Sequence, residues 1–511
     1  MILRDLGEQK LKKYDLTNPQ KSIWVTEEFY KNTSVENIGG NTIINDKVDF
    51  TKLRKAINLL IKNNDSLRLK FVNENGEIKQ YVEDFEELKL SIKDVDSENE
   101  VKKIEKEFVN KPFEVLNSLL FRFQIYKFKS GHGGFIVIVH HLIADAWGAG
   151  LIISQILDAY NSLLENDNYT SNAVSYLGYI SSEKEYLQST KFQKDEAFWQ
   201  EQCSSIPELA SIPATLECKE ISCTAKRKVF KIPMETMNLI SSYCKENKIS
   251  PFNFFMGAYS LYLSRVSSLD EFFIGTPVLN RSNANEKHTI GMFINVVPFK
   301  VKINPEENFL NFVNRISADF FTIFRHQKYS YQMLLENLRK KDSSTPNLYS
   351  ALLSYQNMRT NTKNSKVEYS TKWLFNGNVA DDMEIHFFDI NDSGIINVAY
   401  DYKTSKYTVE DIYALHSRLL HIMNQILEKD TLLLKDVDIV SPDEENEILY
   451  KFNNTDANYP KNKTIVEIFE EQVAKTPQNI ALVYEDKKLT YKELNEKANS
   501  LAHYLSNKRN I

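Results

Sequence analysis

The sequence predicts an α/β protein, with strands and helices mixed in the α+β manner and more than one domain. Apolar runs typical of buried strands alternate with segments of helical spacing along most of the chain. Residues 135–139 are apolar without interruption, as in a strand covered on both faces. Residues 151–164 then repeat apolar side chains at helical spacing. With 511 residues, 42% of them hydrophobic, the chain is long enough to bury several cores.

The other elements follow from similar patterns, taken in chain order. A helix is expected to start at Pro19, where Thr17 or Asn18 can cap it. Glycines at 131, 133 and 134 indicate a hairpin turn before the strand over residues 135–139. The remaining expected elements are helices over residues 50–62 and 183–199, two helical segments within residues 239–266, and strands over residues 119–128, 228–232, 271–278 and 348–358.

Composition excludes several classes of function. The 63 basic and 69 acidic residues give a net charge of −6, and no basic block suited to nucleic acid is present. The first residues lack the apolar centre of a signal peptide, and no run approaches the roughly 20 apolar residues of a membrane span. A soluble, cytoplasmic protein is therefore expected.

The sequence favours neither a metal site nor a disulfide. The four cysteines, which show no Cys-x-x-Cys spacing, are expected to be reduced and structural: Cys203, Cys218, Cys223 and Cys244. The acidic residues Asp381, Asp382 and Glu384 lack further oxygen ligands nearby, so we expect them to face solvent.

The strongest candidate for chemistry is the histidine pair that ends the strand over residues 135–139. A neutral imidazole at His141 can accept a proton near physiological pH, and Asp145 can fix the ring or the loop directly or through an arginine. Two plainer interpretations stand beside this one. His140, His141 and Asp145 can be turn residues with satisfied hydrogen bonds, or a metal site, although adjacent histidines on a strand point to opposite faces.

Residues 140–147, His-His-Leu-Ile-Ala-Asp-Ala-Trp, resemble the His-His-x-x-x-Asp-Gly signature of the condensation domains of nonribosomal peptide synthetases. Further segments resemble that family in the same order: residues 16–24, 63–71, 175–199, 290–298, 325–332 and 348–358. The resemblance covers most of residues 8–435. Ala146 departs from it, since the family usually has glycine there, and a positive φ at alanine would cost roughly 1 kcal/mol.

The resemblance implies two chloramphenicol-acetyltransferase-like lobes that form a V-shaped pseudo-dimer with a central tunnel. Residues 1–170 are the expected N-terminal lobe, residues 171–435 the C-terminal lobe, and residues 436–463 a linker. Residues 464–511 resemble the start of an adenylation domain, and the chain ends before that family's phosphate loop. A fragment of a longer synthetase is the simplest expectation.

The implied reaction is amide formation between an acyl thioester and the amine of an aminoacyl group on a phosphopantetheine carrier. Peptidyl carrier proteins would be donor and acceptor, with acyl-CoA as a possible donor, an adenylation domain downstream, and no metal or other cofactor bound by the domain itself. The resemblance makes His141 the catalytic residue, with His140 and Asp145 beside it. It assigns supporting roles at the tunnel to Arg281 (the expected counter-ion of Asp145), Asn357, Arg68 and Trp147.

Rival functions of the same fold remain open at this stage. An epimerisation domain shares both histidines, but the segment Ala-Trp-Gly-Ala-Gly after Asp145 does not resemble its continuation, and a heterocyclisation domain would replace the histidines by aspartates. A catalytically silent recruitment module typically lacks the catalytic histidine. Segments such as residues 280–287 resemble starter condensation domains, which load an acyl group from coenzyme A, yet elongating domains share parts of them.

Overall fold

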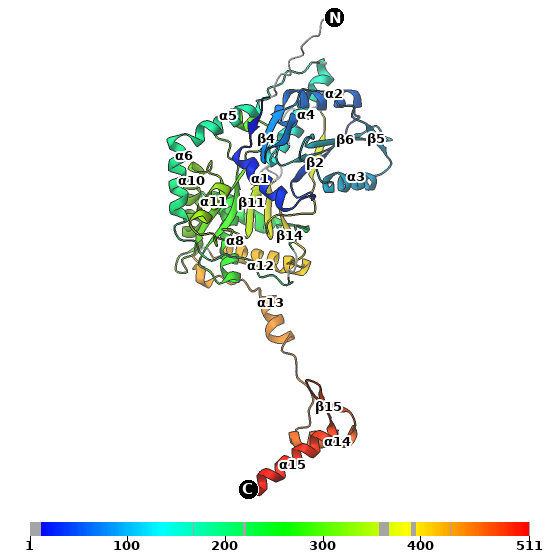
Figure 1. Ribbon diagram of the computed structural model, residues 1–511, viewed down its shortest axis with the longest axis vertical. Coiled ribbons are helices and arrows are strands. Elements are labelled where there is room, and N and C mark those ends of the chain that lie inside the picture. Colours follow the sequence, from blue (N-terminus) through cyan, green and yellow to red (C-terminus); the bar gives the residue numbers. More distant parts are fainter. Residues whose placement is uncertain are drawn as a thin grey trace. The chain divides into compact units, whose positions relative to one another are not determined.

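The computed structural model describes residues 12–166, 168–217, 221–356, 367–389, 395–429 and 431–509. The chain divides into two compact units, Met1–Ser441 and Pro442–Ile511. In the first unit, helices and strands build two lobes, each around a sheet (Figure 1).

A five-stranded sheet forms the centre of the first lobe. In spatial order its strands are β12 (Tyr369–Trp373), β2 (Asn37–Ile44), β7 (Gly133–His140), β6 (Phe121–Phe128) and β5 (Ile92–Val95). Side chains of β7 alternate between two hydrophobic clusters, one shared with α2 (Phe50–Asn63) and α4 (Ala146–Asn166), the other with α3 (Glu98–Asn110). All eight residues of β7 are buried, as expected for a strand covered on both faces.

A three-stranded sheet and one helix complete the first lobe. The strands are, in spatial order, β1 (Tyr14–Asp15), β4 (Glu77–Val82) and β3 (Leu69–Glu74). Helix α1 (Asn18–Phe29) begins at the N-cap Thr17, whose hydroxyl accepts from the backbone of Gln20 while the Gln20 side chain bonds back to the Thr17 backbone. Pro19 lies in the first turn, where its missing N–H costs nothing.

A six-stranded sheet forms the second lobe, reached through α5 (Tyr176–Leu187) and α6 (Thr190–Gln202). In spatial order its strands are β10 (Asn295–Lys302), β9 (Glu271–Val278), β11 (Ala351–Gln356), β13 (Met383–Asp389), β14 (Ile396–Lys403) and β8 (Ala225–Lys231). The helices of this lobe are α7 (Met234–Asn247), α8 (Pro251–Ser267), α9 (Ala284–His288), α10 (Phe309–Arg325), α11 (Tyr331–Lys341) and α12 (Val409–Glu428).

The two faces of this sheet differ in chemistry. Leu353, Ile385 and Tyr400 belong to the large hydrophobic cluster shared with α7, α8, α10, α11 and α12. Because side chains alternate along a strand, their neighbours Ser354 and Asp401 point to the opposite face. That opposite face is polar.

Strand β12 lies within the range expected for the second lobe, yet it pairs with the first. Residues Tyr369 to Trp373 run antiparallel to Ile44 to Gly40 of β2. The hydroxyl groups of Thr42 and Thr371 lie 2.9 Å apart across this pair. The second half of the chain therefore completes the sheet that carries the histidines.

The second unit is small and has an exposed hydrophobic surface. It contains α13 (Pro442–Asn446), α14 (Ile465–Lys475), β15 (Ile480–Tyr484), β16 (Lys487–Thr490) and α15 (Tyr491–Arg509). None of its described residues is buried, and Ile465 is 87% exposed.

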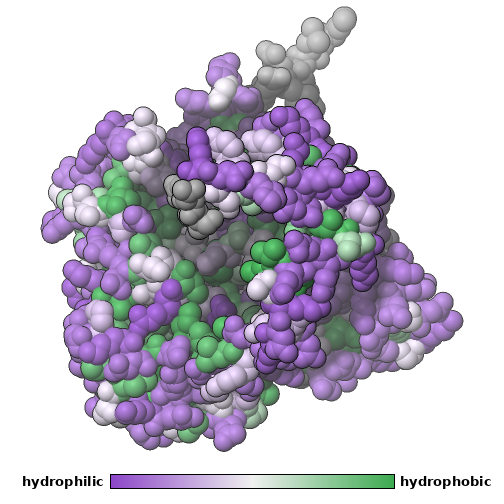
Figure 2. All heavy atoms as spheres, turned by 90° about the horizontal axis from the view of Figure 1, so that it is seen from below, coloured by the Kyte–Doolittle hydropathy of each residue, from purple (hydrophilic) through white to green (hydrophobic). Residues whose placement is uncertain are grey.

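The outer surface is mostly hydrophilic on the face in Figure 2, where hydrophobic side chains lie in separate groups. Phe29 on α1 and Phe321 on α10 are large hydrophobic residues exposed in the first unit. Across the described ranges, no helix combines the length and apolar composition needed to span a bilayer.

Candidate active site

The end of β7 and a short turn position the two histidines. β7 ends at His140, and α4 begins at Ala146. The His140 N–H donates to the Leu120 carbonyl at 2.9 Å, and the His141 N–H donates to the Glu36 carbonyl at 2.8 Å. The backbone of both residues is therefore fixed by neighbouring segments, and their side chains point to opposite sides.

The His141 side chain is half-buried, its ring is desolvated, and one ring nitrogen has no hydrogen-bond partner among the described residues. Among the described residues, its buried Nδ1 has no hydrogen-bond partner. Burial lowers the pKa of His141 to about 4, against an opposing effect of the Asp145 charge and with a small further decrease from His140. The imidazole is therefore neutral at physiological pH.

His140 has a different environment, since it is 1% exposed and bonded at both ring nitrogens. Its Nδ1 accepts from the Leu142 N–H at 3.2 Å, so the proton lies on Nε2, which is 3.3 Å from Oε2 of Glu27. The ring of Phe113 packs against it edge to face. His140 thus holds the turn in place rather than facing a substrate.

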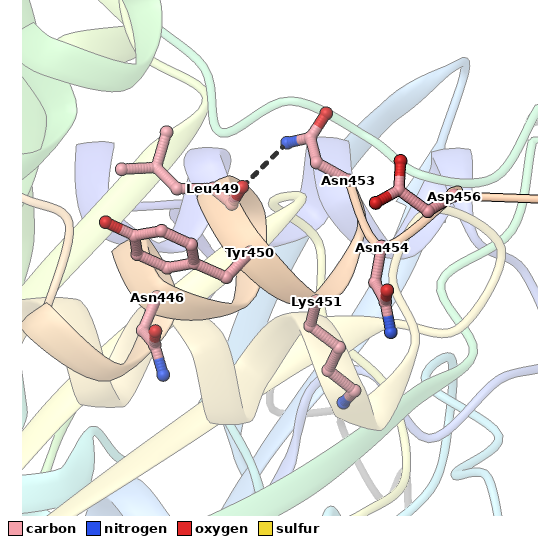
Figure 3. Close-up of a pocket in the computed structure, with 7 residues that line it drawn as sticks. All are labelled: Asn446, Leu449, Tyr450, Lys451, Asn453, Asn454 and Asp456. Atoms are coloured by element: carbon pink, nitrogen blue, oxygen red, sulfur yellow. Dashed lines mark hydrogen bonds between the residues drawn. The ribbon is translucent and has the colours of Figure 1, made fainter.

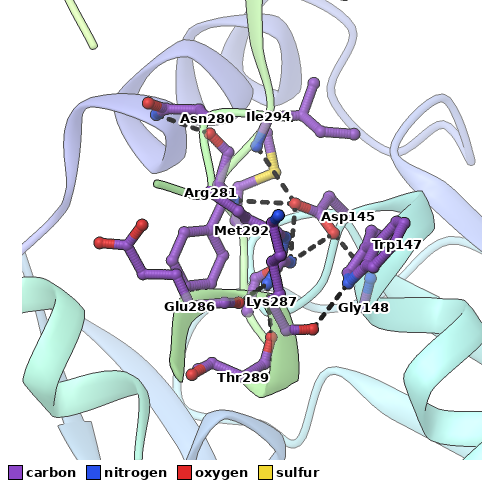
Figure 4. A network of polar contacts seen from close by, with 12 residues as sticks. Asp145, Trp147, Gly148, Asn280, Arg281, Glu286, Lys287, Thr289, Met292 and Ile294 are labelled. Carbon is purple, nitrogen blue, oxygen red and sulfur yellow. Dashed lines mark hydrogen bonds and ion pairs between the residues drawn. The ribbon is translucent and has the colours of Figure 1, made fainter. Parts of the chain in front are cut away.

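Asp145 is fully buried, and both of its carboxylate oxygens accept several hydrogen bonds (Figure 4). Oδ1 accepts from the Gly148 N–H at 2.7 Å, which caps the first turn of α4. Oδ2 accepts from the N–H groups of Phe293 and Ile294 at 3.0 and 3.2 Å. Arg281 Nη2 donates to both oxygens, at 2.8 and 3.0 Å.

Arg281 is the buried partner of this carboxylate. Its other hydrogen bonds go to the carbonyls of Glu286, Thr289 and Gly291. The guanidinium carbon lies 3.9 Å from the centre of the Phe293 ring, in a cation–π contact. The ion pair expected between Asp145 and Arg281 is therefore present. It joins the turn before α4 of the first lobe to the segment between β9 and β10 of the second.

The residues next to Asp145 support the same junction. The Trp147 indole N–H donates to the Lys287 carbonyl at 2.9 Å, which adds a further bond between the lobes. Ala146 is the first residue of α4 and is not among the residues with positive φ. The strain considered for alanine at this position therefore does not arise.

Arg68 and Asn357 lie outside this cluster of bonds. The Arg68 guanidinium donates to the carbonyls of Ile61 at 3.2 Å and Glu83 at 2.7 Å, so it ties the end of α2 to the segment after β4. Its role is structural and internal to the first lobe. Asn357 lies outside the described residues.

Sequence reasoning missed several residues that hold the histidine turn. Gln20 is fully buried, and its amide donates to the Leu142 carbonyl at 2.9 Å. The Tyr176 hydroxyl lies 3.1 Å from the Thr17 hydroxyl and donates to the Met292 carbonyl at 2.8 Å. Thr17, Asn18 and Pro19 gave a signal for the start of the helix, but no signal in the sequence indicated these contacts.

The acidic residues Asp381, Asp382 and Glu384 do not face solvent as expected, since all three are half-buried. Asp382 pairs with Lys403 at 3.4 Å and with Lys406 at 2.6 Å. Glu384 lies with His386 and Asp401 in a group of possible metal ligands that does not include His140 or His141.

An open pocket in the second unit contains none of the site residues (Figure 3). It is lined by Asn446, Leu449, Tyr450, Lys451, Asn453, Asn454 and Asp456. The Asn453 amide donates to the Leu449 carbonyl at 3.0 Å, which closes the helical turn beside it. This pocket has no arrangement of acid, base and nucleophile.

Comparison with protein families and curated proteins gives a consistent result. The family model of the condensation domain matches residues 10–449. Surfactin synthase subunit 1 of Bacillus subtilis (strain 168) is 32% identical over 506 residues, which cover 97% of this chain and 14% of that protein. Gramicidin S synthase 2 of Brevibacillus brevis is 27% identical over 498 residues, 97% of this chain and 11% of that protein. The chain thus spans less than a fifth of either relative.

Solved structures share the fold of the first unit. A starter condensation domain of rhizomide synthetase, in complex with C8-CoA, has a TM-score of 0.72 at 20% identity, covering 84% of this chain and 98% of that one. The first condensation domain of the calcium-dependent antibiotic synthetase, in complex with a substrate analogue, has a TM-score of 0.72 at 16% identity, covering 84% and 99%. These likenesses confirm the predicted two-lobed fold class.

Proposed function

This chain belongs to the family of condensation domains of nonribosomal peptide synthetases, and condensation domains are amide-forming acyltransferases. From that premise we propose how its residues act. The observation that carries the proposal is the neutral, half-buried ring of His141, which follows the end of β7. It lies beside a buried ion pair that joins the two lobes.

The proposed reaction joins an acyl thioester to the amine of an aminoacyl group held on a carrier by phosphopantetheine. The amine nitrogen attacks the thioester carbonyl, the C–N bond forms and the C–S bond breaks. The nitrogen loses a proton and the sulfur leaves as a thiol. The products are an N-acyl aminoacyl thioester and a free thiol.

His141 acts in this proposal by accepting a hydrogen bond from the attacking amine. A group whose pKa is about 4 is a weak base, so it is ill suited to removing a proton from the amine before attack. A neutral imidazole can still orient the nitrogen and take up its proton as the C–N bond forms. Orientation alone can supply a large part of the acceleration.

The remaining site residues have positioning roles. Asp145 does not activate His141 directly, because its oxygens are engaged by Arg281 and by backbone N–H groups. The Asp145–Arg281 pair and Trp147 hold the lobes together beside the turn, and His140 fixes the turn from within the first lobe. Asn357 is proposed as a tunnel residue on the resemblance alone.

Two donors fit the proposal, a carrier-bound acyl group and an acyl-CoA. The likeness to a starter condensation domain crystallised with C8-CoA supports coenzyme A as a donor. The acyl transfer itself would use no cofactor bound by the domain, since phosphopantetheine arrives on its substrates. Peptidyl carrier domains are the proposed partners on the acceptor side.

Residues 464–511 are proposed as the beginning of an adenylation domain. The similarity to surfactin synthase subunit 1 covers 97% of this chain, so it extends beyond the segment matched by the condensation model. The described residues after Ser441 include no buried side chain, although Ile465, Val483 and Leu501 are large and apolar. Such a surface suits a segment that packs against further parts of a larger domain.

The experiment that tests the function offers the chain a charged aminoacyl carrier together with an acyl donor. Mass spectrometry should show the N-acyl aminoacyl product on the carrier, and His141→Ala should abolish it. An epimerisation domain would instead exchange the α-proton of the bound amino acid without forming an amide. A folded wild-type chain that forms no amide with any donor would favour a silent recruitment module.

A further inference from the structure

A group of charged side chains occupies the polar face of the six-stranded sheet, away from the helices of the second lobe. Glu384 and Asp401 stand directly opposite each other on β13 and β14, and Arg227 of β8 stands opposite Asp401. His386 stands opposite Ser354 of β11. These five residues thus form a row across four neighbouring strands.

We propose that Glu384, His386 and Asp401 form a binding site for one divalent transition-metal ion, with zinc as the best-suited ion. Nε2 of His386 lies 3.2 Å from Oδ2 of Asp401 and 3.4 Å from Oε2 of Glu384. All three ligand atoms lie within 4.8 Å of one another. Ligand atoms at about 2.1 Å from a tetrahedral zinc ion stand roughly 3.4 Å apart, so little movement is needed to admit the ion.

Partners outside the three ligands already orient two of them. The Ser354 hydroxyl lies 2.6 Å from Nδ1 of His386, so a proton on Nδ1 leaves the Nε2 lone pair directed between the carboxylates. Arg227 Nε and Nη2 hold the Asp401 oxygens at 2.7 and 2.6 Å. Hydrogen bonds of this kind to ligating imidazoles and carboxylates are common around metal ions.

The charges of the row favour a cation between the two carboxylates. Like charges directly opposite each other on neighbouring strands are unfavourable, and Glu384 and Asp401 have this arrangement. Arg227 compensates only one of them, because both of its hydrogen bonds in the row go to Asp401. His386 and Asp401 are buried, whereas Glu384 is half-buried, so the ion would come from the solvent side of Glu384, where a water can serve as the fourth ligand.

The rival occupant of this space is a proton on His386, which would also bridge the two carboxylates. Binding of a metal ion is distinguished from protonation because it is stoichiometric and saturable and depends on all three ligands. The bound ion would link β13 to β14 on the face of the sheet opposite the hydrophobic core. The inference is independent of the acyltransfer reaction, because the readout is metal binding to the folded chain.

The test titrates ZnCl2 into the full chain after treatment with EDTA, by calorimetry, with Co²⁺ as a spectroscopic probe of the ligand set. The wild type should bind one equivalent and melt at a higher temperature with the ion. Glu384→Gln and His386→Asn should each weaken binding at least tenfold. Glu384→Gln alters a half-buried group and so serves if His386→Asn fails to fold.

His326→Asn is the matched control. Nδ1 of His326 lies 2.6 Å from a buried Asp195 oxygen, so this pair has the same kind of contact as His386 and Asp401. Among the described residues, no third possible metal ligand lies close to this pair. Zinc binding by His326→Asn should equal that of the wild type. The proposal is overturned if the wild type binds no stoichiometric metal, or if Glu384→Gln and His386→Asn bind it as tightly as His326→Asn.

Discussion

His141 combines a desolvated ring with a ring nitrogen that has no partner among the described residues. Because the residue is half-buried at a strand end, its side chain contributes little to the core. We expect His141→Ala to fold like the wild type and to lower amide formation by at least about 100-fold. Product measured on the carrier by mass spectrometry, beside circular dichroism, checks this. Near-normal turnover by a folded variant would contradict the role of His141.

The same residue should contribute to the pH dependence of stability. Burial lowers the pKa of His141 to about 4 in the folded chain, whereas an unfolded histidine titrates near 6.5. Between these values the unfolded state binds more protons, so the contribution of His141 is complete above about pH 6.5 and is lost as the pH falls towards 4.

Urea unfolding at pH 7.5 and pH 5 measures this contribution. The wild type should lose more unfolding free energy between the two conditions than His141→Gln, which has no titrating ring. His416, whose pKa burial also lowers to about 4, is present in both proteins and cancels in the comparison. Equal losses in the two proteins would show that His141 titrates as in the unfolded chain.

The Asp145–Arg281 pair should matter far more to the free energy of unfolding than a surface ion pair does. Both side chains are fully buried, so Arg281→Ala leaves an uncompensated carboxylate and should cost about 3–5 kcal/mol of stability. Lys435→Ala is the control, since Lys435 pairs with Glu306 in the open, where such a pair contributes below about 1 kcal/mol. Denaturant melts compare the two. Similar small losses of stability from both substitutions would contradict the proposal that the Asp145–Arg281 pair holds the lobes together.

Local sequence indicated the candidate residues of this site better than the contacts that hold them in place. The apolar run before His141 predicts a buried strand, and a conspicuous Asp four residues later suggests a partner. The contacts of Glu27 with His140 and of Tyr176 with Met292 join residues more than 100 positions apart. No periodicity encodes such a contact, because it depends on how the lobes pack.

At the scale of elements, the segment from Gly291 to Ile294 joins the two lobes through its hydrogen bonds with Asp145. A Cβ on Gly291 would lie 2.2 Å from Cδ2 of the buried Tyr176 ring, closer than packed atoms allow. We expect Gly291→Ala to shift this segment, to cost about 1–3 kcal/mol and to reduce activity through Asp145. Unfolding free energy and turnover are the two measurements.

Gly178→Ala provides the control for that substitution. Gly178 lies in α5, and a Cβ there would meet no atom within 4 Å. Alanine should therefore stabilise the helix by roughly 0.5–1 kcal/mol and leave turnover unchanged. If both alanine variants behave alike, the close approach of Tyr176 to Gly291 is not what fixes the segment.

Strand β12 shows where prediction from sequence stops at this scale. Its pairing with β2 connects residues more than 300 positions apart, and neither strand has a turn that would bring the other beside it. Hairpin partners such as β6 and β7 are predictable because the turn fixes their register. Assigning residues 171–435 to one lobe by chain order therefore overlooked the strand that returns to the first.

At the scale of the whole molecule, the open question is which acyl donor the chain accepts. If acyl-CoA is the donor, its chain must be buried in an apolar part of the tunnel, and each buried methylene contributes about 0.8 kcal/mol. We expect kcat/KM to rise roughly fourfold per methylene until the cavity is filled. The measurement is acylation of a charged acceptor carrier by acyl-CoAs of increasing length, with a peptidyl carrier donor in a parallel series and His141→Ala in both. Turnover with the carrier-bound donor alone, and none from any acyl-CoA, would contradict acyl-CoA as a donor and indicate an elongating domain.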